Sequence, residues 1–142
     1  MTKKKESNDY NSLLDRAKSL IPKELSVTER LEIPKVKGHL QGNKTIISNF
    51  FQIVKILDRD SDHVLKFLLK ELATKADVKN TSVLFNNKLS SAKINEKIQK
   101  YADTFVTCKE CGKPETKLIK ENNLTFLRCQ ACGAKYTIQY RI

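Results

Sequence analysis

Residues 108–133 read CKECGKPETKLIKENNLTFLRCQACG and contain all four cysteines of the chain. The cysteines form two Cys-x-x-Cys pairs, Cys108 with Cys111 and Cys129 with Cys132, and 17 residues separate the pairs. Two thiolates three residues apart on a tight turn can occupy adjacent corners of a tetrahedron, and the glycine that follows each pair permits that turn. The spacing predicts one four-cysteine metal site.

The predicted metal is a single structural Zn²⁺. Four protein ligands leave no open position for water, so the ion contributes folding energy and no chemistry. Two disulfides would need an oxidising compartment, and a redox dithiol would need only one pair. Iron also suits four thiolates, but rubredoxin-like sites are usually surrounded by aromatic and acidic residues, whereas lysines follow these cysteines.

The residues around the cysteines alternate as β-strands. Residues 116–120 and 124–128 alternate on either side of the turn at 121–123, and residues 135–140 can add a third strand. Residues 105–142 are therefore predicted to form a zinc ribbon.

Upstream, residues 36–104 combine strand and helix patterns. Residues 36–41 and 44–47 flank a turn at Gly42-Asn43, and a second hairpin is expected at 82–89 around Asn86-Asn87. Three amphipathic helices are expected in addition. The first starts at a capping box of Asn49 and Gln52, the second follows the polar turn at 58–62, and the third starts at Ser90 or Ser91 and ends near Asp103.

The amino-terminal residues 1–21 hold one further helix with a narrow apolar stripe. Its members recur at helical spacing: Tyr10, Leu13, Leu14, Ala17, Leu20 and Ile21. Isolated helices this short are marginal in water, so the stripe must pack on a partner or on the rest of the chain. Residues 22–35 carry two prolines and no periodicity, and we read them as a linker. The predicted class is α+β, with an isolated helix, a small central domain and a ribbon.

The chain is strongly basic, with 27 Lys and Arg against 16 Asp and Glu and a net charge of +11. This excess favours a phosphate-bearing partner such as RNA, although a lysine-rich surface alone is the other interpretation. We expect weak, salt-sensitive RNA contacts shared among central-domain lysines and five ribbon residues: Lys109, Lys113, Lys117, Arg128 and Lys135. No apolar run is long enough for a membrane span and no secretion signal is recognisable, so we expect a cytoplasmic protein.

No enzymatic constellation is recognisable. The run Gly42-Asn43-Lys44-Thr45 lacks the Gly-Lys adjacency and the upstream glycine of a phosphate loop, so the chain is not expected to bind GTP. His39 and His63 have no metal-ligand neighbours at ligand spacing. Paired catalytic carboxylates and a cysteine–histidine dyad are also missing, so we expect no catalysis.

Nearly the whole chain resembles the family of archaeal initiation factor 2 beta subunits and, through it, part of eukaryotic initiation factor 5. The resemblance rests on these motifs: Tyr10-x-x-Leu13-Leu14-Asp15-Arg16-Ala17, Glu32-Ile33-Pro34, Gly42-Asn43-Lys44-Thr45, Asn49-Phe50, Leu57-x-Arg59, Lys66-Phe67-Leu68-Leu69-Lys70-Glu71-Leu72, Tyr101, Cys108-x-x-Cys111-Gly112-x-Pro114 and Cys129-x-Ala131-Cys132-Gly133. The chain departs from the family at Leu31, Ala73, Asn87 and Glu115, where phenylalanine, glycine, glycine and aspartate are usual.

The resemblance implies a non-enzymatic subunit of a heterotrimer. In it a gamma subunit binds GTP and methionylated initiator tRNA for delivery to the small ribosomal subunit, and alpha and beta adjust that affinity. It also implies that the amino-terminal helix docks on gamma, which maps onto Tyr10, Leu13, Leu14, Arg16 and Ala17. Two alternatives stay open: a winged-helix transcription factor with a zinc ribbon that binds DNA or RNA polymerase, and a protein scaffold that never touches RNA.

Overall fold

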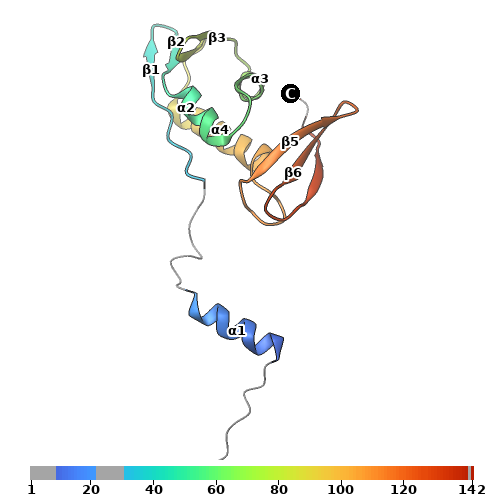
Figure 1. Ribbon diagram of the computed structural model, residues 1–142. Helices are drawn as coiled ribbons and strands as arrows, with labels where there is room; N and C mark the ends of the chain where they lie inside the picture. The colour runs from blue at the N-terminus through green and yellow to red at the C-terminus, as the bar shows by residue number, and fades with distance from the viewer. Residues whose placement is uncertain (1–8, 22–30, 141) are drawn as a thin grey trace, which may run out of the picture.

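The computed structural model describes residues 9–21, 31–140 and 142 (Figure 1). Helix α1 (Tyr10–Leu20) comes first, followed by a central domain of strands and helices and by a carboxy-terminal three-stranded sheet. The predicted α+β class is confirmed. Within the described residues, no helix has the length and apolarity that crossing a membrane requires.

The central sheet is built from two antiparallel hairpins. Strands β1 (Gly38–Gln41) and β2 (Lys44–Ile47) form the first, and β3 (Ala76–Lys79) and β4 (Ser82–Phe85) form the second. The hairpins join through β2 and β4, so the strand order is β1-β2-β4-β3. Gly42 makes the first turn with a φ of 61°, a conformation that glycine adopts without strain.

Three helices cover one face of this sheet. They are α2 (Phe50–Leu57), α3 (Ser61–Glu71) and α4 (Ser91–Phe105). The sheet contributes Ile47, Val83 and Phe85 to a core whose helical members include the buried aromatic residues Phe50, Phe67, Tyr101 and Phe105. His63 joins this cluster as a packing residue, because its Nδ1 lies 2.8 Å from the hydroxyl of Tyr101 and its ring contacts Phe105 edge-on.

The helix starts are mostly those that the sequence predicts. Asp60 accepts from the N–H of Asp62 at the start of α3, and Ser90 accepts from the N–H of Lys93 at the start of α4. The capping box predicted at the start of α2 is not formed, because the Asn49 side chain makes no cap hydrogen bond. The Asn49 side chain instead accepts from the N–H of Lys37 and donates to the carbonyl of Lys35, because the incoming chain offers it backbone partners in a buried position.

The second hairpin was also predicted at the wrong place. Its turn is at residues 80–81, before the expected Asn86-Asn87. The missed strand β3 carries Asp77 and Lys79, charged residues that are depleted in strands. Ala73, where the family favours glycine, precedes this hairpin with a φ of 48°. The first strand is shorter than expected, since β1 begins at Gly38 and not at residue 36.

The ribbon consists of β5 (Thr116–Glu121), β6 (Leu124–Cys129) and β7 (Lys135–Ile138), paired antiparallel in that order. Asn122 and Asn123 close the β5–β6 turn with φ values of 49° and 62°. One face of the ribbon lies against the central domain, because Leu118, Ile138 and Tyr140 pack on its core. Leu31 and Ile33, from the described part of the expected linker, also pack there.

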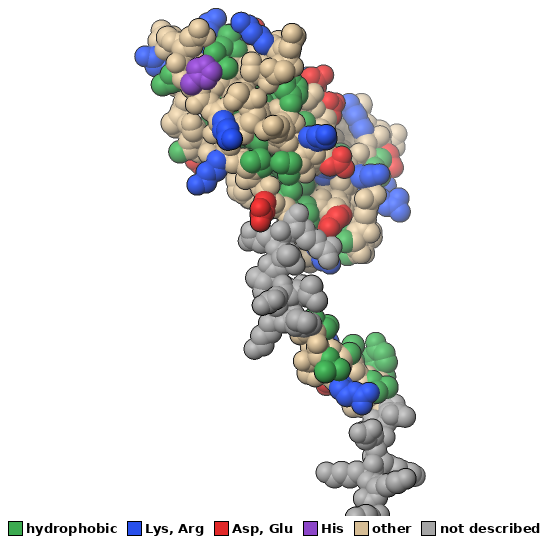
Figure 2. Space-filling model, turned by 60° about the vertical axis from the view of Figure 1, so that its left-hand side comes forward, with side chains coloured by type: hydrophobic (Ala, Val, Ile, Leu, Met, Phe, Trp, Pro, Cys, Tyr) green, Lys and Arg blue, Asp and Glu red, His purple; other side chains and the backbone are tan. Residues whose placement is uncertain are grey.

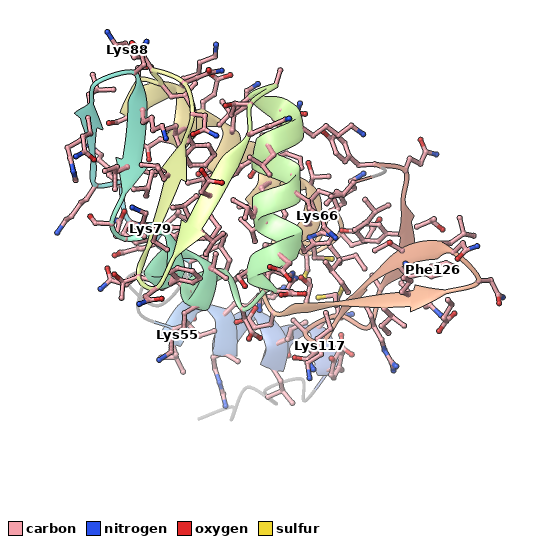
Figure 3. All side chains as sticks on the ribbon, turned by 90° about the horizontal axis from the view of Figure 1, so that it is seen from above. Lys55, Lys66, Lys79, Lys88, Lys117 and Phe126 are labelled. Carbon is pink, nitrogen blue, oxygen red and sulfur yellow. The ribbon has the colours of Figure 1, made fainter. Side chains whose placement is uncertain are left out.

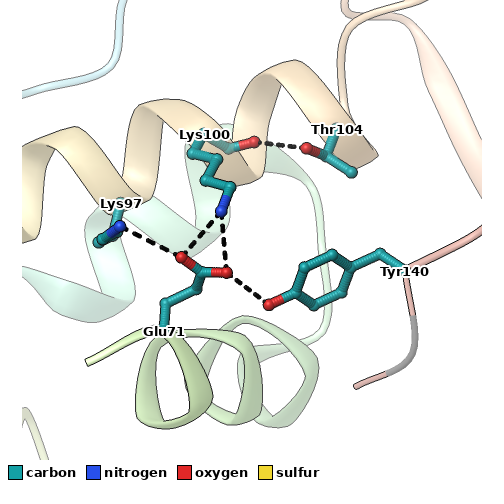
Figure 4. A network of polar contacts seen from close by, with 5 residues as sticks. All are labelled: Glu71, Lys97, Lys100, Thr104 and Tyr140. Atoms are coloured by element: carbon teal, nitrogen blue, oxygen red, sulfur yellow. Dashed lines mark hydrogen bonds and ion pairs between the residues drawn. The ribbon is translucent and has the colours of Figure 1, made fainter. Parts of the chain in front are cut away.

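A charged network joins α3, α4 and the end of the ribbon (Figure 4). The Tyr140 hydroxyl donates to the Glu71 carboxylate at 2.6 Å, and Lys97 and Lys100 of α4 pair with the same carboxylate at 3.2 and 2.9 Å. These donors lower the pKa of Glu71 from 4.5 to about 2, with the Tyr140 hydrogen bond as the largest cause. The same bond raises the pKa of Tyr140 to about 12.

Replacing Tyr140 with phenylalanine tests this network, because the ring packing is kept and only the hydroxyl is lost. We expect the pKa of Glu71 to rise from about 2 towards 4.5. An NMR titration of its carboxyl carbon measures this change. We also expect the free energy of unfolding at neutral pH to fall by about 1.5 kcal/mol, the lower end of the range for hydrogen bonds to charged groups.

Folding lowers the pKa of Glu71, so its ionised carboxylate stabilises the folded state. This stabilisation is complete above pH 4.5 and is lost as the pH falls towards about 2, where Glu71 becomes protonated in the folded protein as well. Tyr136→Phe is the control, since Tyr136 lies on the same ribbon and bonds to Thr107 and Lys109, not to Glu71. An equal Glu71 pKa in both variants would contradict the assignment.

Candidate metal centre and binding surfaces

The four cysteine side chains meet at one end of the ribbon. Cys108 and Cys111 lie on the turn after α4, and Cys129 and Cys132 on the turn after β6. The Sγ atoms of Cys108 and Cys132 are 3.7 Å apart, and those of Cys111 and Cys129 are 3.5 Å apart. All four sulfurs lie within 4.8 Å of one another, and all four cysteines are free.

This arrangement fits a tetrahedral metal ion. Zinc–sulfur bonds of about 2.3 Å put the sulfurs of a tetrahedral site about 3.8 Å apart, whereas a disulfide needs about 2.05 Å. The two measured separations, 3.7 and 3.5 Å, match the metal site and not the disulfide. The structure therefore brings the four predicted ligands together as a cluster that can hold one metal ion.

Backbone geometry shapes each cysteine turn. Gly112 and Gly133 have φ values of 69° and 77°. Their N–H groups donate to the carbonyls of Cys108 at 2.9 Å and Cys129 at 3.1 Å. The N–H of Cys132 points at the Cys129 sulfur, and this donor lowers the pKa of that thiol to about 7. The pKa values of the Cys111 and Cys132 thiols are raised instead, because burial and the neighbouring sulfurs outweigh the backbone N–H groups that act in the opposite direction. A coordinating cation would deprotonate such thiols outright.

Arg59 ties the ribbon to the central domain, a role that no sequence pattern predicted. It lies between α2 and α3, and its guanidinium donates to the carbonyl of Phe105 at 2.9 and 3.2 Å and to the hydroxyl of Thr116 at 2.6 Å. Thr116 begins β5 and donates to the carbonyl of Val106. Burial lowers the pKa of Arg59 from 12.5, but an arginine in a protein stays protonated.

The apolar stripe of α1 is exposed to solvent (Figure 2). No residue of α1 is buried, and Tyr10, Leu13 and Leu14 are 73%, 42% and 37% exposed. Arg16 and Ala17, the other residues that the resemblance assigns to partner binding, are also exposed. The stripe thus has no cover within the described residues.

Strand pairing brings three of the five predicted RNA-contacting ribbon residues into one row. Lys117 pairs with Arg128, and Arg128 pairs with Lys135, so their side chains lie on the same face across β5, β6 and β7. This outer face is opposite the one that packs on the central domain. Lys109 and Lys113 are exposed on the first cysteine turn instead and do not belong to the row.

Two residues modify this row in ways that were not expected from the sequence. Lys135 pairs with Glu121 at 3.0 Å, so part of its charge is already neutralised. Phe126 lies in the next row of the same face, and the Lys135 ammonium sits 4.7 Å from its ring centroid. The alternation predicted for residues 124–128 already implies that Phe126 and Arg128 share one face.

The fold and the site define a class of protein. It is a small α+β protein in which a helix-covered sheet is joined to a ribbon whose four clustered cysteines can hold one metal ion.

Comparison with known proteins gives the family. The family model for a domain found in initiation factors 2B and 5 matches residues 22–135. Translation initiation factor 2 subunit beta from Methanococcus maripaludis is 44% identical over 126 residues, which cover 89% of this chain and 91% of the relative. The same subunit from Methanococcus aeolicus is 42% identical over 131 residues, covering 92% and 94%, and that from Methanosphaera stadtmanae is 39% identical over 130 residues, covering 92% of each.

The chain belongs to the family of translation initiation factor 2 beta subunits. It functions in translation initiation as a non-enzymatic subunit of the factor 2 complex. The resemblance drawn from the sequence is thereby confirmed, and the transcription-factor alternative is set aside.

Replacing Arg59 with lysine tests the joint between ribbon and central domain. Lysine keeps the charge but lacks the planar fork that reaches Phe105 and Thr116 together. We expect a loss of about 1–3 kcal/mol in the free energy of unfolding, measured by denaturant titration, because buried acceptors lose their donors. Lys55→Arg at an exposed site on α2 is the control. A variant as stable as the wild type would show that these bonds do not hold the ribbon in place.

Proposed function

We propose that the chain is the accessory beta subunit of a heterotrimer in which a gamma subunit carries GTP and methionylated initiator tRNA to the small ribosomal subunit in the cytoplasm. Beta binds gamma directly through α1, alpha belongs to the same complex, and the ribbon holds one structural Zn²⁺ and contacts RNA weakly. The observation that carries this proposal is the uncovered apolar stripe of α1, read together with the family.

The exposed stripe needs an apolar groove on another molecule. An eleven-residue helix is marginal in water on its own. The central domain offers it no place in its core, since the core cluster contains no α1 residue. Helix-in-groove binding supplies the missing cover, and a few buried aliphatic side chains then provide most of the binding energy. Leu13 and Leu14, the least exposed large residues of the stripe, are the proposed anchors.

The double substitution Leu13→Asp/Leu14→Asp is expected to abolish copurification with gamma. Burying two unpaired carboxylates costs at least several kcal/mol, which is more than about a thousandfold in the dissociation constant. Copurification from co-expressing cells and titration of purified subunits measure the effect.

The control for this experiment is Ser12→Asp/Ser19→Asp, which adds the same charge on the opposite side of the helix. It is expected to bind gamma like the wild type. Circular dichroism and metal content should be unchanged in both variants, because α1 contributes nothing to the core. Full-stoichiometry binding by the leucine variant would overturn the docking proposal.

Zinc is the proposed metal because the four-thiolate set is closed and the sulfur spacing suits tetrahedral coordination. The free energy of structural zinc binding, about 10–16 kcal/mol in zinc-finger peptides, is folding energy for a small ribbon. The central domain has its own aromatic core and is proposed to keep its fold without the metal.

Elemental analysis of the purified protein is expected to give one zinc per chain and no iron. Cys129→Ser should lose the metal and unfold the ribbon, while NMR signals of Phe67 and Tyr101 keep their dispersion. Ala131→Ser, an exposed change in the same turn, is the control and should keep full zinc content. Zinc retained after Cys129→Ser, or collapse of both domains together, contradicts the proposal.

The ribbon row of Lys117, Arg128 and Lys135 is the proposed RNA surface. Its side chains lie on the outer face, away from the central domain, where a phosphate backbone has access to them. The row carries only three positive charges, and Lys135 already pairs with Glu121. We therefore propose weak, salt-sensitive binding to the phosphate backbone and no base-specific recognition. Binding measured at low and high salt tests this, since affinity that hardly changes with salt is incompatible with it.

A further inference from the structure

Helices cover only one face of the central sheet. Thr45, Ile47, Val83 and Phe85 point towards the helices and are buried. The residues between them alternate to the opposite face, which none of the described helices covers, although Leu84 at its centre is buried and Ile46 is half-buried. In Figure 3, which views the molecule from above, the sheet lies to the left of α3 with Lys79 labelled beside it, whereas Lys66 and Lys117 are labelled nearer the ribbon on the right.

Strand register arranges this open face as three rows. The middle row consists of His39, Ile46, Leu84 and Asp77, which are paired neighbours across all four strands. The first outer row places Gln41 beside Lys44, and Asn86 beside Lys75, whose carbonyl accepts the Asn86 N–H.

The second outer row also carries two lysines. It places Lys37 beside Ser48, which donates to the Lys37 carbonyl, and Ser82 beside Lys79. Lysines thus occupy both outer rows, and the middle row separates them.

The open face is strongly basic. Its four lysines, Lys37, Lys44, Lys75 and Lys79, stand against the single carboxylate of Asp77, a net charge of +3 with His39 neutral. All four are exposed, and within residues 31–140 none of them forms an ion pair. Figure 2 shows lysine and arginine side chains spread over this upper end of the molecule around a histidine.

We propose that this face, which we call the lysine face, binds the sugar–phosphate backbone of an RNA duplex. The outer rows lie about 14 Å apart along the strands and the sheet is about 14 Å wide, at about 3.4 Å per residue and about 4.8 Å per strand. Double-stranded nucleic acid carries about one charge per 1.7 Å of axis, so a face of this size meets several phosphates at once.

The side chains of the lysine face favour a duplex over a single strand. Single-stranded RNA is bound by stacking its bases on aromatic rings, and the lysine face carries no Phe, Tyr or Trp. Duplex RNA is recognised by shape and by contacts to phosphates and 2′-hydroxyls. The lysines supply the first kind of contact, and Gln41, Ser48, Ser82 and Asn86 supply hydrogen-bonding groups for the second.

The test measures binding of the full-length chain to an RNA duplex of about 20 base pairs, longer than the ~16 base pairs that dedicated duplex-binding domains span. The variant is Lys44→Gln/Lys75→Gln/Lys79→Gln. Its matched control, Lys55→Gln/Lys66→Gln/Lys93→Gln, removes three exposed lysines from α2, α3 and α4. Both variants should keep the wild-type circular dichroism, because all six lysines are exposed and outside the described ion pairs.

We expect the sheet variant to bind the duplex about tenfold or more weakly near 0.1 M salt. The slope of log affinity against log salt should fall by about 2 to 3, since each lost phosphate contact removes about 0.9. The helix control should stay within about twofold. Amide chemical-shift changes on adding the duplex should fall on β1 to β4.

Three results would overturn the proposal: equal losses in the two variants, tighter binding of a single strand of the same length than of the duplex, or a duplex that does not bind. The lysine face is separate from the ribbon row. A third variant, Lys117→Gln/Arg128→Gln/Lys135→Gln, distinguishes the two surfaces, because loss of binding only in that variant supports the ribbon and rejects the lysine face.

Discussion

The shortage of apolar surface in each part of this chain is the constraint on which its structure depends. With 142 residues divided among a helix, a central domain and a ribbon, none of the parts can build a large core. The central domain closes its core by packing a sheet face against three helices, with Phe67, Tyr101 and Phe105 at the centre. The ribbon buries little of its own, mainly Leu127, and packs on its neighbour; its four clustered cysteines can hold a metal ion. Helix α1 buries nothing at all.

The contacts between the central domain and the ribbon also provide hydrogen-bond donors for the unpaired carbonyl groups at the end of α4. The last turn of a helix leaves its carbonyl groups without partners. Arg59 bonds the carbonyl of Phe105, and Thr116 bonds that of Val106, so the first residue of the ribbon completes the last turn of the helix before it. At the other end of the ribbon, the Tyr140 hydroxyl donates to the Glu71 carboxylate of α3 and makes a second connection to the central domain. The end of helix α4 therefore fixes where the three-stranded ribbon lies.

Local patterns predicted the parts of this protein, but not the contacts between them. The clustering of the four cysteines, the helix α1, the start of α3 in the polar turn 58–62 and the start of α4 at Ser90 or Ser91 each depend on a short stretch of sequence, and each of these was predicted correctly. Asn49 was misread because its partners, Lys35 and Lys37, are set by how the chain returns to the sheet. Strand β3 was missed because its polar residues belong to an open face, where strand preference is weak. Arg59 belongs to the family motif Leu57-x-Arg59, but its role could not be predicted locally, since its acceptors lie 46 and 57 residues away.

The alternation of core-facing and solvent-facing residues along the strands also determines where the basic side chains lie. Each sheet turns one face towards the shared core, so residues of the opposite parity, many of them basic, point outwards together with a few apolar ones such as Ile46 and Phe126. On the ribbon this gives the row of Lys117, Arg128 and Lys135, and on the central sheet it gives the lysine face. Two separate one-sided sheets thus convert a diffuse charge of +11 into two distinct basic surfaces. Because Arg59 and Tyr140 fix the ribbon on the central domain, these two basic surfaces have a defined position relative to each other.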